Sequence, residues 1–456
     1  MRKLSILFLL CLSIIPLEAT ISAAAVWDVQ TVGSANNGCF FVTGASGMDY
    51  SQGGATVQAT LTTLSVVNAT TTKITVSLTD YTVAAGDVGN GYHNTGGSST
   101  AGWYEITAVD TGANTWTLDR SIGTAGQTVT GIMGGSCASP TSPANNVATT
   151  GNQIYVKGDA TYTLGAGITL GTSSTADNIL VAGYTTTHGD GGSATFQATA
   201  TSIQMLSLNG TNPDAWVFEN FILDCNSQTG TAGLAGNTGS RKVRNVTVKN
   251  CLGTSIRLVS SSAFGFICER CFVTGQGGSG ISFDMATGGE VCIDCAVYNS
   301  GTGAGVGFSM TGAGGIVIRA ICEGNASATT NDCFSITGGA NYIDGGMCYN
   351  AGRDCYRTSS GSSIVRNSIA WTAVGYCFNT TAGSTTTVLN ATEMDYNGCG
   401  GGGTGDYNNV PAGANDVVLT VDPFTDVSTN DFSLNNTAGG GAVLRSAGYQ
   451  LPAPLP

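Results

Sequence analysis

Short runs of β-branched and other apolar residues recur from residue 218 onward, and most of them are followed by Gly, Asn or another turn former. Eight runs align, and their starts are separated by 22 to 25 residues. A second short run lies in most of the intervals, and helical patterns are nearly absent. Such repeats predict an all-β solenoid in which each coil buries its apolar face on the next. The runs are FENFIL from Phe218, VRNVTV from Val243, CERCFV from Cys268, CIDCAV from Cys292, VIRAIC from Val317, YIDGGM from Tyr342, IVRNSI from Ile364 and VLNATE from Val388.

A column of asparagine and glycine follows the first strand of the repeat. Both residue types tolerate the left-handed backbone of a sharp corner, so the column predicts one corner per coil. Stacked Asn side chains also hydrogen-bond from coil to coil. The column comprises Asn226, Asn250, Gly275, Asn299, Asn325, Asn350 and, after a skipped coil, Asn397.

With this repeat and this column, residues 154–431 resemble the right-handed parallel β-helix proteins, the pectate-lyase-like superfamily, which carry such asparagine ladders. The resemblance implies a right-handed parallel β-helix. It implies little about activity, because one fold hosts many chemistries.

The cysteines follow the same period. Two C-x-x-C pairs with twenty residues between them have the spacing of a zinc site. However, the repeat places these cysteines in two columns of successive coils, about 4.8 Å apart and within reach of a disulfide. The sequence therefore predicts a disulfide ladder, with zinc or free buried thiols as the alternatives. Its rungs are Cys225–Cys251, Cys268–Cys292, Cys271–Cys295, Cys322–Cys348, Cys333–Cys355 and Cys377–Cys399.

The first 24 residues have the pattern of a secretory signal peptide. Arg2 and Lys3 precede an apolar run from Leu4 to Pro16, and small residues follow. The run is too short for a stable membrane anchor, so we expect a secreted or cell-surface protein without membrane insertion. Removal of the peptide leaves 14 cysteines, an even number that favours disulfides in an oxidising compartment.

Four segments are expected after the signal peptide. Residues 25–50 form the first strand and cap, residues 51–131 an inserted small β module, residues 132–431 the β-helix and residues 432–456 a C-terminal cap or tail. Cys39 and Cys137 flank the module, and a disulfide between them would stabilise its neck by roughly 3–5 kcal/mol.

The module is rich in aromatic residues. Trp103 and Tyr104 are candidates for stacking on a sugar, because a planar apolar ring covers the C–H face of a pyranose. The alternative is that these rings, with Tyr92, His93 and Trp116, form the core of the module itself.

The net charge of the chain limits the kinds of partner that it can bind. The chain has 16 basic and 29 acidic side chains and a net charge of −13, which disfavours nucleic acid. Ten basic residues lie between Arg241 and Arg366. One outward column alternates in sign, which predicts a cross-strand ion ladder or a substrate-binding track for an acidic polysaccharide. It runs through Asn220, Asn245, Arg270, Asp294, Arg319, Asp344, Arg366 and Asn390.

A second charged cluster is the candidate catalytic site. Asp332 precedes Cys333, and Arg353 and Asp354 precede Cys355 one coil later, followed by Arg357. Stacked carboxylates push their pKa values apart and can supply the acid and the base of glycoside hydrolysis. Alternatively the two aspartates hold Ca²⁺, which neutralises a uronate, and Arg357 is the base.

The sequence thus favours a protein that binds or degrades extracellular polysaccharide as a lyase or glycoside hydrolase. The catalytic motifs of pectate lyases and polygalacturonases are absent from the sequence, so the enzyme question stays open. The alternative is a non-catalytic structural or adhesive surface or fibre protein, which the scarcity of charge and the density of cysteine favour.

Overall fold

The computed structural model describes most of the chain from residue 26 to residue 447. The described ranges are 26–34, 60–66, 72–87, 91–97, 99–100, 102–118, 121–123, 128–134, 153–170, 179–186, 188–208, 216–236, 241–258, 266–277, 281–286, 288–298, 305–327, 330–361, 363–381 and 396–447. The predicted signal peptide, Cys39, Cys137, Asn299 and Asn390 lie outside them.

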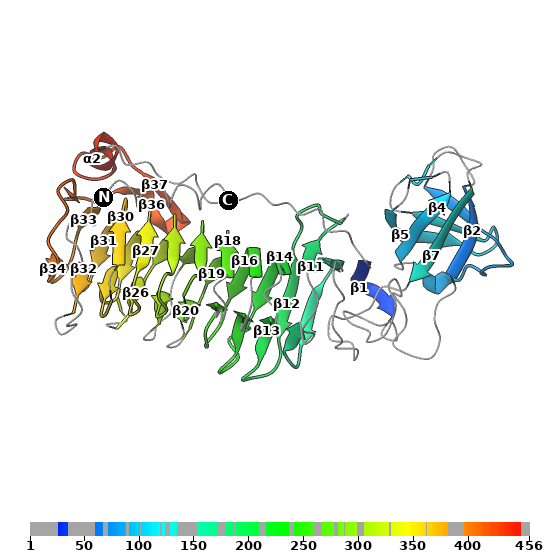
Figure 1. Ribbon diagram of the computed structural model, residues 1–456, viewed down its shortest axis with the longest axis horizontal. Coiled ribbons are helices and arrows are strands. Elements are labelled where there is room, and N and C mark those ends of the chain that lie inside the picture. The colour runs from blue at the N-terminus through cyan, green and yellow to red at the C-terminus, as the bar shows by residue number, and fades with distance from the viewer. Residues whose placement is uncertain are drawn as a thin grey trace.

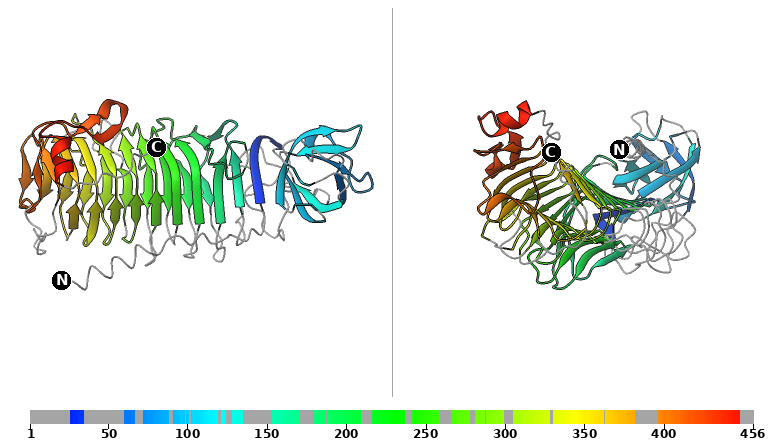
Figure 2. Two further views of the ribbon diagram at one scale, coloured as in Figure 1. Left: turned by 90° about the horizontal axis from the view of Figure 1, so that it is seen from above. Right: turned by 60° about the vertical axis from the view of Figure 1, so that its left-hand side comes forward.

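The predicted parallel β-solenoid is confirmed. Strands of successive coils pair in parallel along the long axis (Figures 1 and 2), and most of them belong to two large sheets of 19 and 10 strands. Short β-branched runs suit this arrangement because each strand has one face in the core and neighbours on both edges.

The 19-stranded sheet contains two stacks that meet at a corner, because β14 and β16 run through the corner as single strands. The first stack contains β1 (Val26–Ser34), β8 (Gln153–Lys157), β11 (Ile179–Tyr184), β14 (Trp216–Asp224), β16 (Arg241–Lys249), β18 (Phe266–Glu269), β21 (Val291–Ile293), β24 (Ile316–Ile318), β27 (Asn341–Asp344) and β30 (Ser363–Arg366). The second adds β9 (Thr161–Leu164), β12 (Ala194–Ala198), β19 (Phe272–Thr274), β22 (Ala296–Tyr298), β25 (Ile321–Glu323), β28 (Met347–Ala351), β31 (Ile369–Ala373), β33 (Gly398–Gly400) and β35 (Val417–Val418).

The 10-stranded sheet closes each coil. Its strands are β10 (Ile168–Leu170), β13 (Gln204–Leu208), β15 (Ala232–Gly236), β17 (Ile256–Leu258), β20 (Ile281–Met285), β23 (Val306–Met310), β26 (Phe334–Ile336), β29 (Tyr356–Thr358), β32 (Tyr376–Thr380) and β34 (Gly405–Asn408).

An aromatic stack runs through the interior behind this sheet. One ring per coil occupies the same column, with ring centroids 4.7 to 5.4 Å apart and nearly parallel planes. These distances match the coil spacing, so the period of the fold itself places the rings in stacking contact. The column is Phe283, Phe308, Phe334, Tyr356, Phe378 and Tyr407.

The first corner carries a left-handed residue in each coil from β14 to β30, with φ between 50° and 73°. These residues are Asn220, Asn245, Arg270, Asp294, Arg319, Gly345 and Asn367. Asn245 donates to Asn220 across 3.0 Å, so an asparagine ladder begins at this corner.

The register corrects the predicted charged column at two positions. Ile318 pairs with Asp344, and Asp344 with Arg366, so these two charged residues lie one position before the corner. The coil that ends at Gly345 is one residue longer than the alignment assumed, because Val317 pairs with Ile343 and not with Tyr342.

The second corner matches the predicted asparagine column only in part. Asn226, Asn250, Gly275 and Asn350 have left-handed backbones, with φ from 52° to 62°, whereas Asn325 does not. Asn397 belongs to the first corner, where its side chain accepts the backbone N–H of Ser368 at 3.0 Å.

Six strands form a closed antiparallel barrel that lies between β1 and β8 in the sequence (Figure 1). They are β2 (Thr60–Val66), β3 (Lys73–Val76), β4 (Gly91–Gly97), β5 (Gly102–Asp110), β6 (Thr115–Leu118) and β7 (Thr128–Gly134), and the short helix η1 (Ala85–Asp87) joins two of them. Because β1 pairs in parallel with β8, the barrel interrupts the chain between two stacked coils.

The C-terminal residues fold back onto the second stack. A hairpin of β36 (Phe424–Asp426) and β37 (Asp431–Leu434), with η2 (Val427–Thr429) between its strands, is followed by α2 (Gly441–Ser446). Their apolar side chains pack with residues of the second stack in one cluster, so the tail covers an outer face of the solenoid. No helix in the described part of the chain is long and apolar enough to cross a membrane.

Candidate functional site

The register brings the four predicted catalytic residues together beside β26 and β29. Because Phe334 pairs with Tyr356, Asp332 lies directly across from Asp354 on the next coil. Arg353 donates two hydrogen bonds to Asp332, one of them from Nε to Oδ1 at 2.7 Å. The Arg357 Nη1 atom lies 3.7 Å from the Asp332 Oδ2 atom. One carboxylate therefore holds two guanidinium groups.

Both carboxylates are buried, with residue exposures of 2% for Asp332 and 1% for Asp354. The Asp354 Oδ1 atom accepts the backbone N–H of Tyr376 at 2.8 Å, and its Oδ2 atom accepts the amide of Asn379 at 2.7 Å. Burial raises the pKa of Asp332 above its ordinary value, and the hydrogen bond from Arg353 opposes that rise. Neither carboxylate presents a free oxygen to solvent.

This geometry does not fit the predicted Ca²⁺ site. Calcium requires six to eight oxygen ligands around one point. Here the oxygens of Asp332 face guanidinium groups and those of Asp354 accept N–H groups, so the ligands are already used. Instead, the carboxylates of Asp332 and Asp354 hold the neighbouring guanidinium and N–H groups in place.

A row of polar side chains lies outside the 10-stranded sheet, next to the buried carboxylates. Register places one member on each of four successive coils, and each is partly exposed because its strand neighbours face the interior. Asn408 donates to Asn379 across 3.0 Å, and Asn379 in turn donates to Asp354. We call this set the polar row; it comprises Ser335, Arg357, Asn379 and Asn408. Sequence reasoning missed both asparagines, although their recurrence after the aromatic column was a usable signal.

The charged column at the first corner consists of separate ion pairs. Its pairs and nitrogen–oxygen distances are Arg319 with Asp294 at 2.6 Å, Arg366 with Asp344 at 2.9 Å, and Arg270 with the preceding Glu269 at 3.4 Å. Each arginine side chain is between 42% and 49% exposed. Exposed pairs of this kind contribute about 0–1 kcal/mol each, and their role in substrate binding stays a prediction.

The aromatic residues of the barrel mostly form its core. Tyr104 is 4% exposed and donates its hydroxyl to the Thr100 carbonyl at 2.8 Å, so its ring is not open to a sugar. Tyr92 and Trp116 are fully buried in the same cluster. A barrel of this size needs large side chains to fill its interior, which explains why Tyr104 is a core residue and not the predicted sugar-stacking residue. The side chain of Trp103 lies outside the described part.

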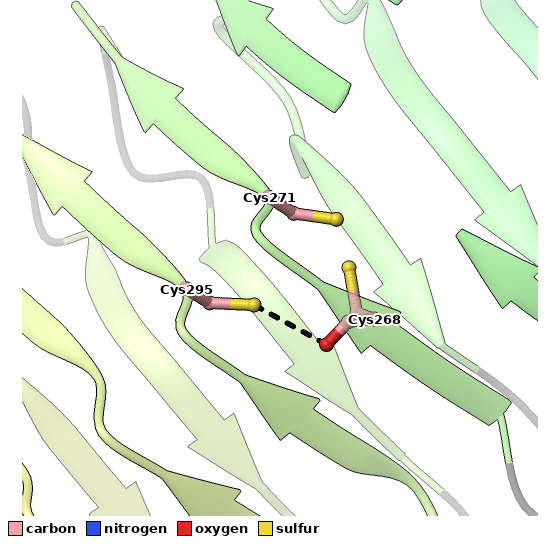
Figure 3. Close-up of side chains that lie close together, drawn as sticks. All are labelled: Cys268, Cys271 and Cys295. Carbon is pink, nitrogen blue, oxygen red and sulfur yellow. Dashed lines mark hydrogen bonds between the residues drawn. The ribbon is translucent and has the colours of Figure 1, made fainter. Parts of the chain in front are cut away.

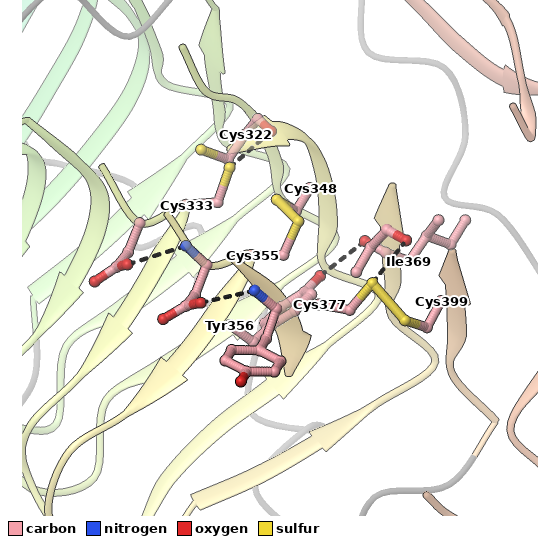
Figure 4. Close-up of a disulfide and its surroundings, with 12 residues drawn as sticks. Cys322, Cys333, Cys348, Cys355, Tyr356, Ile369, Cys377 and Cys399 are labelled. Atoms are coloured by element: carbon pink, nitrogen blue, oxygen red, sulfur yellow. Dashed lines mark hydrogen bonds between the residues drawn. A yellow bond between two sulfur atoms is a disulfide. The ribbon is translucent and has the colours of Figure 1, made fainter. Parts of the chain in front are cut away.

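Within the described ranges, the cysteines form two predicted disulfides and one that the sequence did not predict. Cys225–Cys251 and Cys377–Cys399 are bonded as expected. The third bond joins Cys348 to Cys355 within one coil, which corrects the predicted pairs Cys322–Cys348 and Cys333–Cys355 (Figure 4).

The physical reason is that two cysteine columns face each other across the interior. Their members in one coil are seven residues apart in sequence, with Cα atoms 5.5 Å apart. In the next coil, Ala370 occupies the position that corresponds to Cys348, so Cys377 has no cysteine partner within its own coil. Cys377 therefore bonds to Cys399, one coil further on. Cys322 and Cys333 occupy the same two columns one coil earlier and are free thiols, with the Cys333 Sγ atom 3.2 Å from the Cys322 carbonyl oxygen.

The remaining cysteines that the structure describes form a buried group of four thiols at the first corner, namely Cys268, Cys271, Cys292 and Cys295. Cys268 pairs in register with Cys292, so the predicted stacking of this column is confirmed. The sulfur atoms of Cys268, Cys271 and Cys295 lie within 4.8 Å of one another, and Figure 3 shows them converging on the interior. No disulfide joins these four residues in the structure, in contrast to the predicted rungs.

No known family model and no curated relative matches this chain. Three similar solved structures are ORF18 of Geobacillus virus E2, the A-module of Azotobacter vinelandii mannuronan C-5 epimerase AlgE4, and the catalytic domain of a GH87 alpha-1,3-glucanase. Their respective identities are 14%, 11% and 9%, and the TM-scores are 0.38, 0.33 and 0.27. The matches cover 59%, 59% and 78% of this chain and 52%, 89% and 91% of theirs, so this chain spans about half of the viral protein. The fold stated above rests on the strand register itself.

Proposed function

We propose that this protein binds a polysaccharide along the outer face of the 10-stranded sheet, at the polar row. The observation that carries the proposal is that the buried carboxylates hold two members of the row: Asp332 forms an ion pair with Arg357, and Asp354 accepts a hydrogen bond from Asn379. Donors that are already fixed before binding lose little conformational entropy when a ligand arrives. A rigid row with one polar group per coil suits an extended ligand with regularly spaced hydroxyl groups.

The charge of this region favours hydroxyl groups over a polyanion as the recognised feature. Two aspartates offset the two arginines, Arg353 and Arg357, so the region is close to neutral. The guanidinium side chains remain 33% and 27% exposed. Their outer N–H groups are thus available to donate hydrogen bonds to hydroxyl oxygens of a ligand.

Binding without cleavage is the activity that this geometry supports. An acid or base in glycoside hydrolysis must reach the glycosidic oxygen or the attacking water. The Asp332 side chain has no exposed area, and both oxygens of Asp354 already accept hydrogen bonds. A lyase or hydrolase at this site would need a carboxylate that faces the ligand.

Three disulfides in the described coils support a location outside the reducing cytoplasm. This agrees with the export that the N-terminal pattern predicts. A secreted or surface-bound protein would meet its polysaccharide there.

The test is electrophoresis of the full chain through gels that contain neutral or acidic polysaccharides, combined with size-exclusion analysis of each polysaccharide after incubation. We expect retardation by at least one hydroxyl-rich polysaccharide and no shortening of its chains. Arg357→Ala should weaken the retardation at least tenfold. Arg257→Ala is the matched control, because Arg257 lies on the same sheet in β17 and pairs with Asp284 at 3.4 Å.

Shortened polysaccharide would replace this proposal with the lyase or hydrolase alternative. Equal retardation of the Arg357 and Arg257 variants would place the binding site elsewhere. Retardation by none of the polysaccharides would leave the structural or adhesive role, which the continuous aromatic stack and the disulfides favour because they make the solenoid rigid.

A further inference from the structure

The buried group of four thiols has the composition of a metal site. All four side chains have 0% exposure, and three of their sulfur atoms lie within 4.8 Å of one another. The fourth, Cys292, is the direct register partner of Cys268 on the next coil. A four-sulfur set closed on all sides is typical of structural zinc sites, and the C-x₂-C…C-x₂-C spacing agrees with it.

Register stacks these cysteines on successive coils, and the structure leaves them unbonded. Cys268 and Cys292 are direct partners in parallel strands, where side chains stand side by side about 4.8 Å apart. A disulfide needs Cβ atoms about 3.5–4.5 Å apart. The pairs Cys348–Cys355 and Cys377–Cys399 are not register partners, and their Cα atoms lie 5.5 and 6.1 Å apart. Cys225 and Cys251 lie on successive coils with Cα atoms 4.8 Å apart and are bonded, so stacking alone does not prevent a disulfide.

Later in the solenoid, the register column of Cys295 places backbone N–H groups beside acceptor side chains. Gly346 donates its backbone N–H to the Ser368 hydroxyl at 3.1 Å, and Ser368 donates its own to the Asn397 side chain at 3.0 Å. The corner therefore supplies an inward donor to an acceptor side chain in more than one coil. Where this column and the one beside it both hold cysteines, four buried thiols gather at the corner.

We propose that Cys268, Cys271, Cys292 and Cys295 together bind one thiophilic cation, for which Zn²⁺ is the representative. Because the protein supplies all four ligands and the group is fully buried, the cation has no open position and its role is structural. It joins the coil of β18 and β19 to the coil of β21 and β22. This inference is independent of the polysaccharide proposal, since the thiols lie in the interior and not on the outer face.

A second cysteine group, Cys377, Cys399 and Asp406, does not qualify as a site. Its sulfur atoms already form a disulfide and are not thiolate ligands. The contrast makes the four-thiol group testable by thiol chemistry as well as by metal content.

The experiment uses the full chain, purified without chelator. We expect about one zinc per chain by elemental mass spectrometry, and cobalt substitution should give the visible absorption of a tetrahedral thiolate complex. Under denaturing conditions, the thiols of Cys268, Cys271, Cys292 and Cys295 should become alkylatable once a chelator has removed the metal. Cys268→Ser with Cys292→Ser should abolish metal binding, whereas Cys322→Ser with Cys333→Ser should retain it.

Two results would overturn the inference. The first is a folded protein that neither contains zinc nor binds added Zn²⁺ while its four thiols are reduced. The second is a peptide map in which these cysteines are joined as disulfides. If the double serine variant does not fold, Cys295→His distinguishes a metal site from a cysteine cluster that only fills the core. A histidine nitrogen can replace a sulfur ligand, so this variant should still bind zinc.

Discussion

Removal of Arg353 should destabilise the fold far more than removal of a similar arginine at the surface. Arg353 makes a two-point contact with Asp332, whose side chain has 0% exposure. Breaking a buried pair by deleting one partner costs about 3–5 kcal/mol, since it leaves an uncompensated charge. The nearby Arg357 and the N–H of Asp354 remain, so we expect Arg353→Ala to cost about 2–3 kcal/mol.

Arg319→Ala is the matched control. Arg319 contacts Asp294 through the same two-point geometry, at 2.6 and 2.8 Å, but the two side chains are 42% and 22% exposed. An exposed pair contributes roughly 0.5 kcal/mol. Urea unfolding at pH 7, followed by circular dichroism, should therefore show a much larger fall in midpoint for the Arg353 variant. Equal falls in the urea midpoint of the two variants would refute the reasoning, because burial would then not determine the free energy lost with the ion pair.

The pH dependence gives an independent check. Burial raises the pKa of Asp332 in the folded state, and Arg353 opposes this rise. Without Arg353 that pKa rises further. Between the unfolded and the folded pKa the folded state binds the extra proton, so stability increases as pH falls through this window. The loss of unfolding free energy caused by Arg353→Ala should therefore become smaller as the pH falls. A loss that stays constant with pH would contradict the proposed role of Arg353 in opposing the pKa rise of Asp332.

Three further predictions concern the interior and the corner. Oxidised protein should carry a Cys322–Cys333 disulfide, because these residues occupy the columns of the bonded pair one coil on, and non-reducing peptide mapping that finds both as free thiols would contradict this. Phe334→Ala should cost about 3–5 kcal/mol of unfolding free energy in urea, because the ring stacks on neighbours 5.0 and 4.8 Å away. Ser335→Ala beside it should change stability by less than about 0.5 kcal/mol. Asn245→Ala should cost about 1–2 kcal/mol, because it removes a hydrogen bond and keeps a β-carbon at a φ of 52°, and Asn245→Gly should cost less in the same assay.

The pattern of residues alone was sufficient to predict the solenoid and the length of its repeat. β-branched runs every 22 to 25 residues determined that each coil has short strands and an apolar inner face, because alternation along a strand decides which side chains turn inward. The cysteine columns followed from the same period, and Cys268 does stack on Cys292. The grouping of Asp332 with Arg353, Asp354 and Arg357 was also predictable, because it depended on neighbouring cysteines in one register.

Only the tertiary structure decided which members of these columns meet and which stay accessible. One extra residue in a coil moved Asp344 and Arg366 off the corner, and sequence spacing could not detect it. Cys348 bonds within its coil because two columns converge across the interior, a distance set by the cross-section of the solenoid and not by the repeat. Likewise, residue type does not reveal burial. Asp354 is buried and accepts the N–H of Tyr376 from the next coil, and Tyr104 is buried and donates to the Thr100 carbonyl four residues earlier.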